Sequence, residues 1–179
     1  MTLYFVTTSA GKFAEAERLI PGLRQLAADL PEIQEFDAAA IIRAKLDAAR
    51  RGHEGEFIVE DTSLYLDALN GLPGPFIKWF LARLGPQGIY DLAEKLGDTR
   101  ASARTCVGYA DPGGVTRFFE GTVTGHVVAP RGERGFGWDP LFVPHGSDLT
   151  FAQMDPAEKQ RFSMRRLALE DFRRFHAAR

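Results

Sequence analysis

The sequence is nearly without cysteine and has no long hydrophobic run. Cys106 is the only cysteine among 179 residues, so no disulfide can form within the chain, and a zinc site built from thiolates is disfavoured. No apolar segment approaches the ~20 residues that a membrane helix requires. The first residues also lack the basic start and apolar stretch of a signal peptide. We therefore expect a cytoplasmic protein without a membrane partner.

An excess of positive charge is missing as well. The chain has 22 Lys and Arg residues against 24 Asp and Glu residues, a formal net charge of −2. Proteins that track long nucleic acids usually carry a basic excess, so we expect no nucleic-acid polymer as a partner. A local cluster of cations would still suit a small anionic ligand. The composition, 45% hydrophobic and 26% charged, is typical of one globular domain or of two small lobes that share a core.

Apolar spacing and turn residues predict a mixture of helices and strands. The predicted elements are a strand at 3–8, a tight loop at 9–12, a helix from 13 that ends at Pro21-Gly22, a helix at 37–51 capped by Asp37, a buried strand at 57–60, a rigid turn at 70–75, helices at 76–84 and 86–96, antiparallel strands at 101–110 and 115–128, and helix from 156 onward. This alternation indicates an α/β or α+β class with a central sheet.

The segment Thr7-Thr8-Ser9-Ala10-Gly11-Lys12 lies between the first strand and the first helix. A helix N-terminus offers free N–H groups and the positive end of a dipole, and Lys12 adds a charge, so the segment suits a phosphate. Its glycine spacing is not that of a P-loop. The alternative interpretation is an ordinary turn with a helix cap.

Glu60-Asp61-Thr62 is placed by the prediction at the carboxyl end of a strand, where ligands of open sheets bind. A carboxylate there can hold Mg²⁺ or polarise a water, although paired acids at strand ends also serve as caps. Glu32 is a second candidate oxygen ligand. By sequence alone it resembles any surface glutamate.

Two later segments carry groups that suit a nucleotide base. Gly135-Phe136-Gly137-Trp138-Asp139-Pro140 places aromatic rings beside glycines, which favours stacking on a base. The basic run 158–166 offers ammonium and guanidinium donors. A packed aromatic turn and a solvated helix face are the alternatives.

Taken together, these segments resemble the inosine triphosphate pyrophosphatase family, also called the Ham1 family. The resemblance runs from Thr7 to Arg165 in family order and spacing. Its most specific parts are Glu60-Asp61-Thr62, the stretch Ala68-Leu69-Asn70-Gly71-Leu72-Pro73-Gly74-Pro75-Phe76-Ile77-Lys78-Trp79-Phe80, Val128-Ala129-Pro130-Arg131-Gly132 and Phe136-Gly137-Trp138-Asp139-Pro140.

The resemblance implies a role for each matching residue. Asp61 would be catalytic, and Glu32 and Asp61 would bind Mg²⁺, the implied cofactor. Phe136 and Trp138 would bracket the base, and Arg165 would donate to its 6-oxo group. The implied substrate-binding residues are Thr7, Thr8, Ser9, Lys12, Lys45, Thr62, Lys78, Phe136, Gly137, Trp138, Asp139, Lys159, Met164 and Arg165.

The family further implies the fold, the reaction and the assembly. The fold would be α/β, with an elongated central mixed β-sheet and two α/β lobes flanking a nucleotide-binding cleft, in a single domain over residues 1–179. The reaction would be Mg²⁺-dependent hydrolysis of ITP, dITP or XTP to the monophosphate and pyrophosphate, which cleanses the nucleotide pool. The substrate would be a small-molecule nucleoside triphosphate, and a homodimer is expected because most family members are dimers.

Two positions depart from the family pattern. Ser9 stands where the family usually has Asn, and Met164 stands where it usually has the His of Ser-His-Arg. Because an apolar, adaptable side chain replaces a base contact, we predict looser base selection than is usual in the family. Two other functions stay open: a Maf-like pyrophosphatase acting on pyrimidine or modified nucleotides, and a nucleotide-binding module without turnover.

Overall fold

The computed structural model describes residues 2–179. Within these residues, no helix is both long enough and apolar enough to span a membrane. The elements in chain order are β1 (Leu3–Val6), α1 (Ala10–Glu17), β2 (Arg24–Leu26), α2 (Ala38–Gly52), β3 (Glu56–Leu66), the 3-10 helix η1 (Asp67–Leu69), β4 (Pro73–Gly74), α3 (Ile77–Lys95), β5 (Arg100–Ala110), β6 (Thr116–Val127), β7 (Phe142–Pro144), α4 (Pro156–Arg161) and α5 (Met164–Ala177).

The strands form one mixed sheet. Its order is β2-β1-β3-β5-β6-β7, and β4 pairs with β3 beside this path. β1 runs parallel to β2 and β3, with Leu3 opposite Glu56, whereas β4 pairs antiparallel with β3, and β7 antiparallel with β6. The predicted α/β class and mixed central sheet are thereby confirmed. The arrangement of lobes around a cleft stays a prediction.

The chain divides into two compact units. The first consists of the residues up to Asp61 together with Thr105–Gly121 and Arg165–Arg179, and the second of Thr62–Arg104 and Thr122–Met164. β3, β5 and β6 each contribute residues to both units. The prediction of a single domain over 1–179 stays a prediction.

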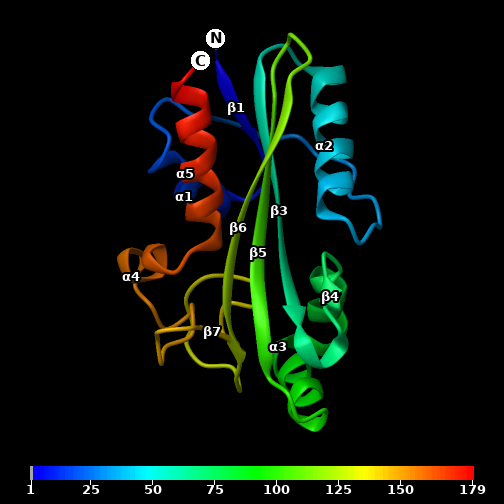
Figure 1. The fold of residues 1–179 in the computed structure, drawn as a ribbon, viewed down its shortest axis with the longest axis vertical. Helices are drawn as coiled ribbons and strands as arrows, with labels where there is room; N and C mark the ends of the chain where they lie inside the picture. The colour runs from blue at the N-terminus through cyan, green and yellow to red at the C-terminus, as the bar shows by residue number, and fades with distance from the viewer. Residues whose placement is uncertain (1) are drawn as a thin grey trace. The chain divides into compact units, whose positions relative to one another are not determined.

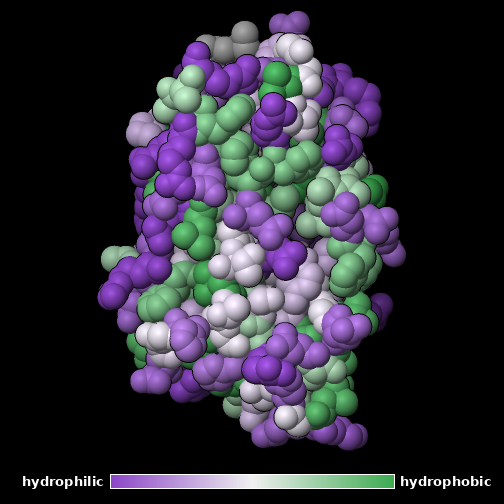
Figure 2. Space-filling view, viewed as in Figure 1, coloured by the Kyte–Doolittle hydropathy of each residue, from purple (hydrophilic) through white to green (hydrophobic). Residues whose placement is uncertain are grey.

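In the first unit, strand alternation gives the sheet two buried faces. Ile58 of β3 packs in a cluster with Phe5, Leu169 and Phe172, and Phe57 and Val59 pack in another, which includes Ile42 and Leu46 of α2. Figure 1 shows α1 and α5 on one side of β1 and β3, and α2 on the other. Figure 2 shows hydrophilic residues along the outer sides of α5 and α2, as expected of helices that bury one face.

The second unit has its own apolar core. The core includes Leu64 and Leu66 of β3, Ile89 of α3, and Trp138 and Phe142. α3 contains the predicted break, because Gly85 has φ 66° and the helix resumes at Pro86. The predicted turn at 70–75 includes Asn70 at φ 52° and a cis Leu72-Pro73 bond.

Some local predictions were wrong. Asp61 is not at the carboxyl end of a strand, because β3 continues to Leu66 and buries Leu64 and Leu66 in the second unit. The helix predicted from 13 to Pro21-Gly22 ends earlier, at Glu17, and residues 24–26, for which no element was predicted, form β2 by pairing with β1. The loop expected at 9–12 is mostly helix, because α1 begins at Ala10. The C-terminal helix is interrupted between Arg161 and Met164.

Candidate functional site

Glu60 and Asp61 are adjacent in β3 and therefore point to opposite faces of the sheet. Glu60 follows Ile58 onto the face covered by α1 and α5, where it contacts Lys12 and Arg165. Asp61 follows Val59 onto the α2 face, where it contacts Lys45. The register of β1 with β3 pairs Phe5 with Ile58, so both acids lie just beyond the paired part of β1. The acidic pair thus supplies one carboxylate to each of two clusters.

On the α2 face, Lys45 joins two carboxylates. Its Nζ lies 3.1 Å from Asp61 Oδ1 and 3.7 Å from Glu32 Oε1, and it also donates to the Glu60 carbonyl oxygen at 3.4 Å. The lysine side chain is only 8% exposed, whereas that of Glu32 is 54% exposed. Lys45 lies on the buried stripe of α2 with Ile41, Ile42 and Leu46, so the amphipathic pattern of this helix positions the ammonium group. Two carboxylate groups therefore lie beside one ammonium group.

The N-terminus of α1 adjoins the end of β1. The Ser9 hydroxyl caps the helix by accepting from the backbone N–H of Lys12 at 3.3 Å, and the Ser9 N–H donates to Thr7 Oγ1 at 3.1 Å. Lys12 lies in the first helical turn, and its Nζ is 3.1 Å from Glu60 Oε1. The first turn of a helix carries a positive partial charge, so this end of α1 is suited to an anion. Thr8 is exposed beside it.

Glu60 lies at the centre of a buried ionic cluster. Arg165 donates to it twice, from Nε to Oε2 at 2.8 Å and from Nη2 to Oε1 at 3.0 Å, and Arg165 Nη1 donates to Glu15 of α1. Burial alone would raise the pKa of Glu60, but the charges of Arg165 and Lys12 and their hydrogen bonds outweigh it and lower that pKa to about 2. Burial would lower the pKa of Arg165, yet Glu60 and Glu15 raise it. Glu60 and Arg165 are therefore both held in their charged forms.

In the second unit, Asp139 organises the aromatic segment. Its Oδ2 accepts from the Phe136 backbone N–H at 2.9 Å and from Lys159 Nζ at 2.8 Å. Lys159 Nζ lies 5.2 Å from the centroid of the Phe136 ring. Gly135 has φ 77°, and a Cβ there would lie 2.0 Å from Asp139 Oδ2. Only glycine therefore lets the chain pass so close to the buried aspartate.

The two rings predicted to bracket a base lie in different environments. The Phe136 ring is exposed, with Lys159 near its face. Trp138 is 6% exposed and packs edge-on against Phe142, with ring centroids 5.6 Å apart. Phe136 thus offers an accessible face, whereas Trp138 belongs to the core. The bracketing role of Trp138 stays a prediction.

Other predicted residues of the second unit have less distinctive surroundings. Thr62 is half-buried in β3, Lys78 is exposed near the start of α3, and Gly137 is exposed with φ 62°. Met164 is buried in the apolar core. Their substrate-binding roles stay predictions.

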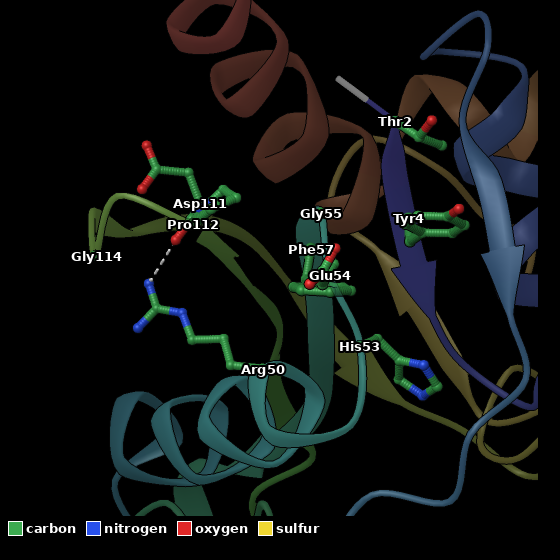
Figure 3. Close-up of a pocket in the computed structure, with 10 residues that line it drawn as sticks. All are labelled: Thr2, Tyr4, Arg50, His53, Glu54, Gly55, Phe57, Asp111, Pro112 and Gly114. Carbon is green, nitrogen blue, oxygen red and sulfur yellow. Dashed lines mark hydrogen bonds between the residues drawn. The ribbon is translucent and has the colours of Figure 1, made fainter.

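A cavity of about 650 Å³ lies in the first unit, and no predicted site residue lines it. Its lining includes Tyr4, Arg50, His53 and Asp111, and Figure 3 shows Arg50 reaching from α2 toward the turn at 111–114. Arg50 Nη2 donates to the carbonyl oxygens of Asp111 and Val115 at 3.2 and 3.0 Å. Arg50 thus ties the end of α2 to the β5–β6 turn, which is a structural role.

Known proteins match this chain over nearly its whole length. The model described as the Ham1 family matches residues 3–175. The chain belongs to the Ham1 family. Inosine triphosphate pyrophosphatase 1 of Trypanosoma cruzi is 44% identical over 170 residues, which are 92% of this chain and 86% of that protein. The inosine triphosphate pyrophosphatase of Schizosaccharomyces pombe is 38% identical over 178 residues, 97% of this chain and 94% of that protein.

Solved structures agree with this assignment. The structure of the Staphylococcus aureus Ham1 protein matches with a TM-score of 0.81 at 27% identity and covers 98% of each chain. The family predicted from the sequence motifs is therefore confirmed.

In this Ham1 protein the predicted residues gather in two groups. The first unit brings together Lys12 with Arg165, through Glu60, and Lys45 with Glu32 and Asp61. The second unit brings together Phe136, Asp139 and Lys159. Sequence reasoning missed Glu15 as a partner of Arg165, and it treated Glu60 only as a neighbour of Asp61. The position of Glu60 within the acidic motif was the one available signal, because Glu15 lies 150 positions from Arg165.

Proposed function

We propose that this Ham1 protein hydrolyses the triphosphates of deaminated purine nucleosides (ITP, dITP and XTP) to the monophosphate and pyrophosphate, with Mg²⁺ as cofactor. The observation that carries the proposal is the meeting of Lys45 with Asp61 and Glu32, at 3.1 and 3.7 Å. The names of the Trypanosoma cruzi and Schizosaccharomyces pombe relatives supply the substrate class. The cellular role is the removal of damaged purines from the nucleotide pool.

The donor set around Lys45 fits Mg²⁺. Mg²⁺ is usually bound by one or two carboxylates together with waters and substrate phosphates, and Asp61 and Glu32 supply two carboxylates at one ammonium group. These two residues would hold the ion. When bound, the ion would supply Lewis-acid stabilisation of negative charge on the phosphate oxygens. Asp61 is also the group that orients the attacking water and accepts its proton.

The lysines neutralise the triphosphate, which carries about four negative charges near neutral pH. Lys12 adds its ammonium charge to the N-terminus of α1, where backbone N–H groups can donate to phosphate oxygens. Lys45 lies beside Asp61 and serves the phosphate near the attacking water. Lys78 and Lys159 are the remaining cations of the predicted set. Phosphoryl transfer depends chiefly on such positioning and charge stabilisation.

The reaction is an attack of water on the α-phosphorus. A bond forms between the water oxygen and the α-phosphorus while the bond to the bridging oxygen of the β-phosphate breaks, so pyrophosphate leaves. The water gives up its proton to Asp61. No covalent intermediate with the protein is required.

The base is recognised by stacking and by hydrogen bonding. Phe136 presents an exposed ring, and base–aromatic stacking contributes about 1–3 kcal/mol. Arg165 is a pure donor and therefore favours the 6-oxo acceptor of hypoxanthine or xanthine over the 6-amino group of adenine. Met164 replaces a polar base contact, so GTP is expected to be hydrolysed with an efficiency close to that of ITP.

A nucleotide panel tests the proposal. Pyrophosphate release from ITP, XTP, dITP, GTP, ATP and dUTP is measured with a coupled phosphatase assay, in Mg²⁺ and in EDTA. We expect release from ITP and XTP that EDTA abolishes. Preferential release from dUTP would instead support the Maf-like alternative. Tight nucleotide binding without any release would support a binding module and would refute the proposed hydrolysis.

We also propose that the protein is a homodimer, on the strength of the family resemblance alone. Light scattering coupled to size exclusion measures the mass directly. A mass near twice 19.8 kDa is expected, and a monomer at micromolar concentration would contradict the proposal.

A further inference from the structure

Glu60 is a buried carboxylate that contacts two residues predicted to bind the substrate. Its side chain is 2% exposed, and it contacts Lys12 of α1 at 3.1 Å and Arg165 of α5 at 2.8 Å. No substrate-binding or metal-binding role was predicted for it. It points away from the Lys45 cluster, because Asp61 occupies the opposite face of β3.

The two side chains that contact Glu60 differ in solvent exposure. The Lys12 side chain is 24% exposed, while those of Glu60 and Arg165 are each 2% exposed. The Lys12 ammonium group can therefore donate to an incoming phosphate on its solvent side while Glu60 holds it on its buried side. A lysine side chain loses rotamer freedom when it is ordered, and an anchor that restrains it before binding reduces the cost of ordering it in the complex.

Arg165 is restrained in the same way from two directions. Glu60 accepts from its Nε and Nη2, and Glu15 accepts from its Nη1. Glu15 and Lys12 lie one turn apart on α1, so the cluster links one helix face to β3 and to the start of α5. Buried ion pairs contribute little net stability compared with apolar packing. Their best-attested benefit is a defined geometry, which residues that bind a base and a phosphate require.

We propose that Glu60 is a positioning residue, which holds Lys12 for the triphosphate and Arg165 for the base without contacting the substrate itself. This inference rests on the proposed function. It predicts that loss of the Glu60 charge changes substrate binding and base discrimination together, because one carboxylate orients both groups.

The test compares Glu60→Gln, Glu60→Asp and the matched control Glu56→Gln. Glu56 lies four residues earlier on the same face of β3 and bonds Tyr109 and His176, so its replacement perturbs a partly buried polar network elsewhere in the same unit. KM and kcat are measured for ITP and for ATP, at a temperature where circular dichroism shows each variant to be folded. Should Glu60→Gln fail to fold, Glu60→Asp and the double variant with Lys12→Met carry the test.

We expect Glu60→Gln to raise the KM for ITP about 10- to 100-fold, the loss typical of hydrogen bonds to charged groups, and to lower the ratio of ITP to ATP efficiency. Glu60→Asp should recover part of both, and Glu56→Gln should change neither. In a Lys12→Met background, Glu60→Gln should raise the KM for ITP less than it does in the wild-type protein, because only its effect through Arg165 remains and residues acting through one another are not additive.

Three results would overturn the inference: wild-type KM and discrimination in Glu60→Gln, equal losses in Glu56→Gln, or fully additive effects with Lys12→Met. Failure of the proposed function is distinct, since in that case the wild-type protein itself releases no pyrophosphate from ITP.

Discussion

Replacement of Asp61 by asparagine separates catalysis from stability. The asparagine side chain would have nearly the shape of the aspartate but no charge and a much weaker basicity. In the structure, Asp61 Oδ1 lies 3.1 Å from Lys45 Nζ, and the two side chains are 17% and 8% exposed. At an effective dielectric constant of about 20, Coulomb's law gives about 5 kcal/mol for such a pair before the desolvation cost is counted.

The net loss of stability should be much smaller than the Coulomb energy. Lys45 retains Glu32 and the Glu60 carbonyl oxygen as partners, so we expect about 1–3 kcal/mol. For a chain of this size, 1 kcal/mol corresponds to about 2–4 °C in the unfolding temperature. Asp61→Asn should therefore stay folded at 25 °C.

The loss of turnover should be far larger. General-base catalysis contributes about 10²- to 10⁴-fold, and removal of a metal ligand adds to this, so we expect kcat for ITP to fall at least 10³-fold, or about 4 kcal/mol in the barrier. The assay is pyrophosphate release with saturating ITP and Mg²⁺, alongside thermal unfolding of both proteins. Asp47→Asn, on the exposed side of α2, is the control. A folded Asp61→Asn protein with kcat within tenfold of wild type would refute the assignment of Asp61.

Three further predictions concern the other clusters. Gly135→Ala places a Cβ 2.0 Å from Asp139 Oδ2, so it should raise the KM for ITP and lower the unfolding temperature; an unchanged KM would contradict the positioning role of Asp139. Trp138→Ala should cost about 3–5 kcal/mol of unfolding free energy because the ring is buried, whereas Phe136→Ala should leave stability nearly unchanged and raise KM, as urea denaturation and kinetics would show. Burial would raise the pKa of Glu56, but its hydrogen bonds and nearby cations hold that pKa below the usual 4.5. Its contribution to stability is therefore present above pH 4.5 and lost as pH falls below it. The unfolding free energy of Glu56→Gln should fall less than that of wild type between pH 7 and pH 3, and parallel curves of unfolding free energy against pH would disprove this.

Local chemistry made much of the fold predictable. Asp37 caps α2 by accepting from the Ala39 N–H, and Gly85 interrupts α3, because both signals act within a few residues of the backbone they control. The boundary at Asp61 was not predictable in this way. Apolar spacing cannot show that β3 runs on from one compact unit to the other, since the partners that bury its second half are distant in sequence.

The candidate site was predictable in composition more than in geometry. The motifs identified Asp61, Lys12 and Arg165 as members, but the pairing of Arg165 with Glu60 joins residues 105 positions apart. Strand alternation could have separated Glu60 from Asp61 in advance, had β3 been predicted at its full length. Trp138 is buried because Phe142 and Phe151 pack against it, and no local sequence pattern predicts these contacts.

The most direct test of the central claim is the position of solvent oxygen in the products. Wild-type protein is incubated with ITP and Mg²⁺ in ¹⁸O-labelled water, and the inosine monophosphate and pyrophosphate are examined by mass spectrometry. Attack at the α-phosphorus places the label in the monophosphate and leaves the pyrophosphate unlabelled. Labelled pyrophosphate, or products other than these two, would contradict the account.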